Sequence, residues 1–264
     1  MIYFVATPIG NLKDISYRAI ETLNFVDIIA CEDTRNSLKL LNFYGIKKKL
    51  IAYHKFNEQS SSNGIIELAQ EGKNIAIISD AGMPLISDPG YILVQKLKQY
   101  SIPYTIIPGA NAGLSALVLS GLSTERFTFI GFLPEKLADR KSLLEEIKTY
   151  KTTLIFYISP HNVFKDIEFL GKHLGNRKAC LVKEITKLHE KALNFNLLDE
   201  LDFEAKGEYV LIVEAQATEK STPSATIEEQ VQALIESGLK KNDAIKQVAK
   251  QNNLPKNEVY QKFI

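Results

Sequence analysis

Short apolar runs alternate with amphipathic stretches along the amino-terminal half of the chain. The runs are rich in β-branched residues and end in polar or Gly/Pro clusters, which is typical of strands buried on both faces of a sheet. The stretches between them carry apolar residues at helical spacing. Alternation of this kind predicts a parallel sheet with crossover helices. Its strands are predicted at residues 2–6, 26–31, 49–53, 75–78 and 104–107.

Particular residues indicate where the helices of this region begin and end. Ser16 is suited to cap the first helix. A second helix, with Leu38 among its core-facing residues, is predicted to end at Gly45 as its C′ glycine. Asp88 followed by Pro89 has the order of a cap and a first helical residue, and the fourth helix is predicted over residues 91–100.

The same alternation starts again from Glu125. It predicts a second set of strands at residues 127–132, 153–158, 178–185 and 208–214. The stretch 186–201 has no regular pattern and receives no assignment. We therefore expect two α/β domains, one over residues 1–121 and one over residues 122–216.

A polar segment rich in Ser, Thr and Pro follows, and we interpret residues 217–225 as a linker. Beyond it, Thr226 and Glu229 have the spacing of a helix capping box. Helical patterns then predict a small helix-turn-helix-like domain over residues 226–264. Its lysines outnumber its acidic residues, so contact with a phosphate backbone and a simple solvated face both stay open.

Composition narrows the possible classes of protein. The chain has 264 residues and a net charge of +1, which gives no overall sign of nucleic-acid binding. No apolar segment approaches the roughly 20 residues of a membrane span, and the start resembles a strand rather than a signal peptide, so we expect a cytoplasmic protein. Cys31 and Cys180 are expected to be free thiols. The scattered histidines lack metal-ligand spacing, so no metal is expected.

Each predicted strand of the first domain ends in a cluster suited to a ligand site, namely TPIGN, EDTR, His54, SDAGMP and PGAN. Parallel strands place these clusters at one edge of the sheet, where open α/β sheets bind ligands. The sequence lacks a Gly-x-Gly dinucleotide fingerprint, a Walker lysine and a serine nucleophile elbow. The residues alone therefore predict a small-molecule site built from atypical loops across two α/β domains.

Eight stretches together resemble the tetrapyrrole methylase superfamily: VATPIGNLKD, CEDTR, SDAGMPLISDPG, PGANA, GFLPEK, FYISPHN, KEITKLHEK and GEYVLIVEA. They follow family order, and the match is closest to the branch that modifies ribosomal RNA. The resemblance implies two α/β domains, the first with a parallel and the second with a mixed sheet, plus a C-terminal helical domain. It also implies a homodimeric, S-adenosylmethionine-dependent enzyme. Its substrate would be the ribose 2′-hydroxyl of a decoding-centre cytidine in the 16S rRNA of the small ribosomal subunit.

By this resemblance, the cofactor is folded into the cleft between the two domains. Its methionine part and ribose would be held by Asp80, Ala81, Gly82, Met83 and Ile86. The same cleft would be lined by Pro8, Pro108, Gly109 and Ala110, and the adenine covered by Leu133, Tyr157 and Ile158. For Pro108 and Gly109 a plain strand-to-helix turn is the alternative. Because the sulfonium methyl is already activated, the site needs in-line positioning and exclusion of water rather than a metal.

A sugar hydroxyl is a weak acid, so a general base is expected but not strictly required. Asp33 is the first candidate because it lies beside Arg35 at the sheet edge. Glu184, Glu32 and His54 are the others, with a simple ion pair as the alternative for Glu184 and a surface position for His54. The cations expected to contact RNA phosphates are Lys13, Arg18, Arg35, residues 47–49, Lys136 and Arg140.

The chain departs from the usual pattern of this family at four positions. Met83 stands where Thr is usual, Ile158 where Glu is usual, and Asn162 and Lys183 where Arg is usual. Ile158 instead resembles the apolar contact of tetrapyrrole-modifying relatives. Two other functions therefore stay open. One is a tetrapyrrole C-methyltransferase, against which EDTR, GFLP and the basic tail argue, and the other is a non-catalytic RNA-binding or ribosome-assembly protein.

Overall fold

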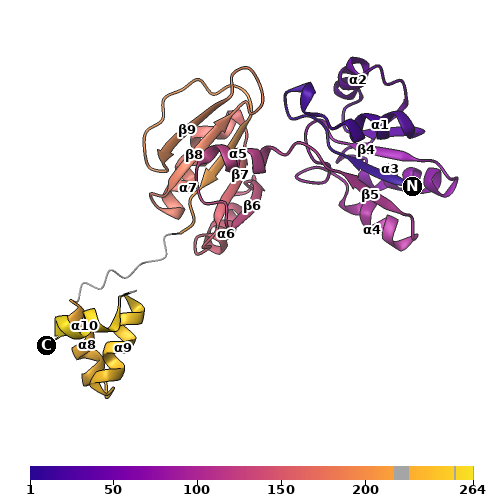
Figure 1. Ribbon diagram of the computed structural model, residues 1–264. Helices are drawn as coiled ribbons and strands as arrows, with labels where there is room; N and C mark the ends of the chain where they lie inside the picture. The colour runs from indigo at the N-terminus through magenta and orange to yellow at the C-terminus, as the bar shows by residue number, and fades with distance from the viewer. Residues whose placement is uncertain (217–225, 253, 264) are drawn as a thin grey trace. The chain divides into compact units, whose positions relative to one another are not determined.

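The computed structural model describes residues 1–216, 226–252 and 254–263, and the chain divides into two compact units, residues 1–216 and 217–264 (Figure 1). The predicted linker, residues 217–225, lies outside the described residues. The first unit contains two sheets and the second contains helices. None of the described helices has the length and hydrophobicity needed to cross a lipid bilayer.

The first sheet is parallel throughout, with strand order β3-β2-β4-β1-β5. Its strands are β1 (Ile2–Val5), β2 (Ile28–Cys31), β3 (Lys49–Ala52), β4 (Ile75–Ile78) and β5 (Tyr104–Ile107). β4 occupies the centre and is buried at every position, as its apolar sequence predicts. The predicted parallel sheet is confirmed, and the loops after its strands share one edge.

Helices cover both faces of this sheet. After the short 3₁₀ turn η1 (Leu12–Asp14), they are α1 (Tyr17–Phe25), α2 (Thr34–Phe43), α3 (Glu58–Gln70) and α4 (Tyr91–Gln99). Leu23 of α1 and Leu41 of α2 pack with Ala76 on one face. Ile65 of α3 and Leu93 of α4 pack with Ile75 and neighbouring strand residues on the other face. Side chains that alternate along β4 thus supply two separate cores.

The helix ends agree with the sequence prediction at Ser16 and Gly45, whereas one predicted core residue and one predicted cap differ. The Ser16 hydroxyl accepts a hydrogen bond from the Ala19 amide at 3.1 Å, as a cap does. Gly45 follows α2 with a φ of +68°, a conformation that favours glycine. Leu38, predicted to face the core, is 45% exposed, because α2 buries a narrower face than its apolar residues suggest.

The second difference concerns the cap of α4. The helix begins at Tyr91, as predicted, but its cap residue is Gly90 and not Asp88. Glu58 of α3 supplies the missing acceptor: its Oε1 accepts from the amides of Gly90 at 2.8 Å and Ile92 at 3.2 Å. The predicted capping role of Asp88 is therefore wrong, because a carboxylate distant in sequence takes that position.

The second sheet is mixed, with strand order β6-β7-β10-β8-β9, and only its β6–β7 pair is parallel. Its strands are β6 (Phe127–Phe132), β7 (Thr153–Ile158), β8 (Lys178–Lys183), β9 (Lys191–Asn196) and β10 (Tyr209–Val213). The mixed sheet implied by the family resemblance is confirmed. β9 lies in the stretch that the sequence pattern left unassigned. It is an edge strand with mostly exposed side chains, so its apolar alternation is weak.

Helices cover this sheet on both faces as well (Figure 1). One face packs against α6 (Leu137–Ile147) and α7 (Val163–Leu174), which follows the 3₁₀ turn η2 (Pro160–Asn162). The other face packs against α5 (Ala112–Ser120), whose Ala116 and Leu117 contact the second sheet's core. Although α5 precedes the predicted boundary at residue 121, it packs on the second sheet. The boundary itself stays a prediction.

The carboxy-terminal unit is a cluster of helices with its own small core. It contains α8 (Ile227–Glu236), α9 (Lys241–Gln251) and α10 (Lys256–Phe263). Val231, Ile245, Val248 and Val259 are its fully buried centre. The predicted capping box is confirmed, because the backbone amides and side chains of Thr226 and Glu229 exchange hydrogen bonds at 2.6 and 3.2 Å.

Candidate functional site

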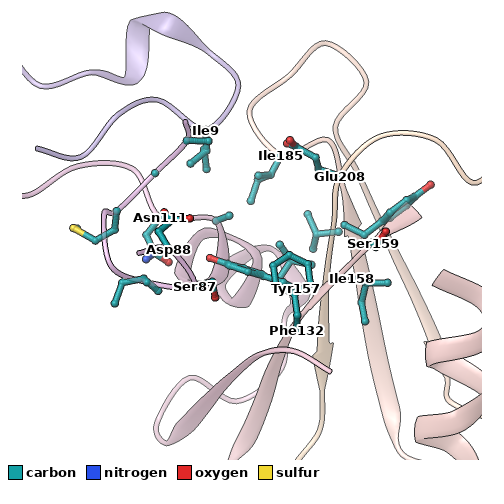
Figure 2. A pocket seen from close by; sticks show the side chains of 18 of the residues that line it. Ile9, Ser87, Asp88, Asn111, Phe132, Tyr157, Ile158, Ser159, Ile185 and Glu208 are labelled. Carbon is teal, nitrogen blue, oxygen red and sulfur yellow. The ribbon is translucent and has the colours of Figure 1, made fainter. Parts of the chain in front are cut away.

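A cavity of about 410 Å³ lies at the carboxyl edge of the first sheet, walled on its other side by the second sheet (Figure 2). Its volume is within the range of small-molecule sites. From the first domain it is lined by Ile9, residues 80–83, residues 86–88, Asn111 and Ala112. From the second it is lined by Phe132, residues 157–160, Val182, Ile185 and residues 208–210. The loops after β1, β4 and β5 therefore share one cavity with the second domain, whereas the predicted clusters after β2 and β3 supply none of its lining residues.

Backbone hydrogen bonds join the loops after β1 and β4. The Thr7 amide donates to the Gly82 carbonyl at 2.9 Å, and the Gly82 amide donates to the Thr7 carbonyl at 3.1 Å. Gly82 has a φ of +80°, and a Cβ there would lie 3.1 Å from Cγ2 of Ile9. A side chain at residue 82 would therefore be strained and would push against the cavity wall.

The two domains approach each other closely beside the cavity. A Cβ on Gly10 would lie 2.5 Å from Cγ of Lys187, and a Cβ on Gly131, where φ is +76°, would lie 3.2 Å from Oγ of Ser87. Loops of one domain thus meet residues of the other at two places. These contacts hold the second domain against the loop edge of the first.

Seven of the residues predicted to bind the cofactor line the cavity, namely Asp80, Ala81, Gly82, Met83, Ile86, Tyr157 and Ile158. Five others, Pro8, Pro108, Gly109, Ala110 and Leu133, are not among its lining residues. Gly109 is pressed against Ala6, since a Cβ on it would lie 3.0 Å from the Ala6 Cβ. Leu133 packs on the core of the second domain instead. Binding of a cofactor by any of these residues stays a prediction.

The charged side chains that line the cavity, within the described part of the chain, are all acidic: Asp80, Asp88 and Glu208. Asp80 is held in place by donors, because its carboxylate accepts from the Asp33 amide at 3.1 Å and from Nδ2 of Asn36 at 3.0 Å. A cavity lined in this way favours a ligand that carries positive charge.

Asp33, the first candidate for a general base, is fully engaged. Its Oδ1 caps α2 by accepting from the Arg35 amide at 2.8 Å. Both carboxylate oxygens also accept from the Arg35 guanidinium, at 3.2 and 2.9 Å. Hydrogen bonds from the Arg35 side chain and then its backbone lower the pKa of Asp33. These bonds make its carboxylate a weaker base.

Glu184 is engaged in a similar way. Burial, the largest single influence, raises its pKa, but hydrogen bonds from the Glu208 amide at 2.8 Å and from Lys187 at 3.0 Å leave the pKa lowered overall. Lys187 also binds Glu208 at 2.8 Å. Within the residues that the structure describes, Glu184 does not line the cavity, whereas Glu208 does.

Asp88 is the titratable residue that sequence reasoning missed. It lines the large cavity and also a small cavity on the other side of its loop, which it shares with Glu32 and Tyr53. Burial raises the pKa of Asp88 to about 6, helped by the charges of Glu32 and Asp80 and opposed by a hydrogen bond from Ser79. In the sequence, Asp88 is marked only by the Pro-Gly that follows it, a pattern that is also typical of a helix cap.

Glu32 and His54 lie near the small cavity rather than the large one. Burial raises the pKa of Glu32, Asp80 and Asp33 raise it further, and His54 lowers it. The His54 amide donates to the Asn57 side chain at 2.8 Å, and the half-buried ring lies edge-on to Phe56. Neither residue therefore lines the large cavity.

Tyr157 crosses the cavity from the second domain toward Asp88 (Figure 2). Its ring packs edge-on against Phe129 and Phe132, with centroids 5.1 and 5.5 Å away. Burial raises the pKa of Tyr157, the Gly113 amide lowers it, and the charge of Asp88 raises it. Tyr157 thus presents a neutral hydroxyl and an aromatic face to any occupant of the cavity.

The cations predicted to contact RNA differ in their solvent exposure and in whether they form ion pairs within the protein. Lys13, Arg18 and Lys136 are exposed, and the Arg35 side chain is 87% exposed although it binds Asp33. Arg140 is instead largely buried: it forms an ion pair with Asp166 and stacks over Phe169 at 4.7 Å. Its packing accounts for a cation at that position without RNA, so its RNA contact stays a prediction.

Residues 1–202 match the family of tetrapyrrole (corrin/porphyrin) methylases. The chain is 45% identical to ribosomal RNA small subunit methyltransferase I of Halalkalibacterium halodurans, over 98% of this chain and 93% of that protein. It is 38% identical to the protein of the same name in Bacillus subtilis, over 100% of this chain and 94% of that protein.

Solved structures share the fold at low identity. A diphthine synthase aligns with a TM-score of 0.66 and 15% identity, over 81% of this chain and 89% of that one. The uroporphyrin-III-C-methyltransferase of Thermus thermophilus aligns with a TM-score of 0.59 and 17% identity, over 81% and 93%. The two sheets, the cavity between them and these matches all indicate the same fold family. The chain belongs to the tetrapyrrole methylase family, within the group of ribosomal RNA small subunit methyltransferase I proteins.

Proposed function

We propose that this protein is an S-adenosylmethionine-dependent methyltransferase that modifies the ribose 2′-hydroxyl of a cytidine in the decoding region of 16S rRNA. The observation that carries the proposal is the extent of the similarity to the named relatives. The 45% identity spans 98% of the chain and so reaches beyond residue 202, where the general family match ends. A tetrapyrrole-specific enzyme would share the first two domains without needing the basic tail.

The cavity supports S-adenosylmethionine as the methyl donor. The donor carries a positive sulfonium and an ammonium group, and the charged residues lining the described cavity are acidic. The loop of residues 80–83 would hold its polar part, and Tyr157 and Ile158 offer an apolar wall for its adenine. When bound, the donor supplies a methyl group that is already activated. The protein's task is then to align the ribose hydroxyl and exclude water.

Exposed cations near the same edge of the first sheet support an RNA substrate. Arg35 lies in the first turn of α2, the helix that follows β2, and Lys13 and Arg18 flank the start of α1. Each can contact a phosphate while the target nucleoside reaches the cavity. We further propose that the enzyme is a cytoplasmic homodimer, and exposed apolar residues on α5 such as Val118, which is 73% exposed, suit a subunit interface.

The test is methylation of purified small ribosomal subunits from a strain that lacks this gene, with isotope-labelled S-adenosylmethionine. We expect label in 16S rRNA, and nuclease digestion with mass spectrometry should locate it in one 2′-O-methylcytidine. Label in uroporphyrinogen III but not in the subunits would show a tetrapyrrole methyltransferase instead. Absence of S-adenosylmethionine binding in calorimetry would favour a non-catalytic RNA-binding protein.

A further inference from the structure

This inference rests on the proposed function, in which the ribose hydroxyl must lose a proton to an acceptor group. The acceptor must reach the cavity and must have a free oxygen. Asp33 does not line the cavity and is bound by Arg35 through both oxygens. Asp80 accepts from Asn36 and from a backbone amide, and Glu208 is bound by Lys187. The partners of Asp33 lower its pKa and weaken it as a base, and those of Asp80 and Glu208 occupy carboxylate oxygens that would have to accept the proton.

Asp88 meets these requirements better, because it lines the cavity and the partner described for its carboxylate is the neutral Ser79 hydroxyl rather than a cation. It lines the cavity on the wall opposite the second sheet, and the Tyr157 ring extends toward it from the other side (Figure 2). Both residues line the cavity, and the charge of Asp88 contributes to the raised pKa of Tyr157 after the larger effect of burial. A substrate group that enters between them would contact a carboxylate on one side and an aromatic hydroxyl on the other.

The backbone around Asp88 is held in a costly conformation. Leu85 and Ser87 have φ values of +73° and +69°, which are unfavourable for residues with a side chain. Gly90 has a φ of +143°, and a Cβ there would lie 2.5 Å from Cγ of Leu85. Glu58 fixes the end of this loop by binding the Gly90 amide. Strain of this kind persists where the surroundings impose it, and it is concentrated at functional positions.

We propose that the Asp88 carboxylate is the general base for methyl transfer. The ribose oxygen forms a bond to the methyl carbon of the donor as its proton passes to a carboxylate oxygen of Asp88. The carbon–sulfur bond breaks with its electron pair on sulfur, so the positive sulfonium becomes a neutral thioether. Asp88 ends protonated and returns the proton to water when the products leave.

The surroundings of Asp88 tune it for this role. The charged groups that face it are Glu32 after β2 and Asp80 after β4, and the phenols of Tyr53 and Tyr157 lie in the cavities that it lines. Burial and the two carboxylates hold its pKa at about 6. It is therefore mostly ionised at neutral pH, and it is a stronger base than an ordinary aspartate.

The test compares Asp88→Asn with Asp33→Asn and with Asp202→Asn, an exposed aspartate that lines neither cavity. Single-turnover methylation of small subunits and the calorimetric affinity for S-adenosylmethionine are measured for each. We expect Asp88→Asn to slow methylation by about 10²–10⁴-fold and to leave the affinity for the donor within about threefold. The wild-type rate should rise with pH through about 6, and this rise should be absent in Asp88→Asn.

Two results would overturn the inference while leaving the proposed function intact. An active wild type with an Asp88→Asn rate within about threefold of it, or a larger loss in Asp33→Asn, would exclude Asp88 as the base. A tenfold or greater loss of donor affinity in Asp88→Asn would make the residue a donor-binding group. An inactive wild type would instead reject the proposed function, and the inference with it.

Discussion

Asp88 and Asp33 have opposite environments although they lie near each other at one edge of the first sheet. Two groups on Arg35 stabilise the carboxylate of Asp33, whereas burial and two neighbouring carboxylates disfavour that of Asp88. A group whose folded-state pKa is raised binds protons more tightly in the folded state. The ionised form of Asp88 therefore lowers the stability of the protein at neutral pH.

Replacing Asp88 by Asn should accordingly stabilise the protein. We expect the free energy of unfolding at pH 8 to rise by about 1–2 kcal/mol, after allowance for the solvent that reaches this half-buried group. That corresponds to a melting temperature higher by about 2–8 °C. The gain should shrink as the pH falls through about 6, because the wild-type carboxyl then becomes protonated in the folded state.

Thermal unfolding of both proteins at about pH 8 and about pH 5 checks this prediction, with Asp202→Asn as a control for an exposed aspartate. An equal difference in melting temperature at the two pH values would contradict it. Stabilisation together with lost activity would be the expected mark of a residue retained for chemistry rather than for folding.

At the level of elements, α3 and α4 are linked by a cap that comes from a different helix. Glu58 at the start of α3 accepts from the first amides of α4, and its Oε1 also lies 3.4 Å from the Tyr53 hydroxyl. The loop that carries Asp88 ends at this point. The stability of α4 and the position of the loop therefore depend on the same carboxylate.

Glu58→Ala should remove this link. We expect a loss of about 1 kcal/mol of stability, the usual value of a cap, and faster hydrogen exchange at the amides of Gly90 and Ile92. Glu67→Ala, an exposed change on the same helix, is the control and should leave both amides protected. Unchanged exchange in Glu58→Ala would show that the loop is held by other contacts.

The same elements show how far the sequence predicts this structure. The strands β4, β5, β6 and β7 have the bounds that their apolar runs predict, because burial on the sheet leaves a local pattern. The start of α4 at Tyr91 was predicted, but the group that caps this helix was not predictable from neighbouring residues, because that acceptor lies 32 residues earlier in the chain. Which sheet α5 packs against is likewise a tertiary property, since its sequence is apolar on all sides.

For the site, the sequence predicted five loops, of which those after β1, β4 and β5 line the cavity, and it did not specify which residues of each loop face it. After β4 the prediction was largely correct, because most of that loop lines the cavity. After β5 it selected Gly109, whereas Asn111 and Ala112 line the cavity and Gly109 packs on Ala6. The direction of a side chain within a turn depends on its dihedral angles, which residue types alone do not specify.

At the scale of the whole molecule, the net charge of +1 gives no long-range attraction to RNA. Binding must then depend on local cations, and Arg35, whose side chain is 87% exposed after β2, is the first candidate. Arg35→Ala should weaken binding of the small subunit and reduce the slope of log affinity against log salt by about one unit. Lys98→Ala, at the far end of α4, removes the same charge from the opposite edge of the sheet and is the control. Equal slopes in the two variants would contradict a phosphate contact at Arg35.

The pair of main-chain hydrogen bonds between Thr7 and Gly82 has an evolutionary consequence. Because these bonds use no side-chain atoms, the shape of this wall survives the exchange of neighbouring side chains, such as that of Met83. Substitutions at such positions can change the side chains that the cavity wall presents to a ligand without changing the backbone that forms the wall. Gly82 is exempt from that freedom, since its dihedral angles admit almost no other amino acid.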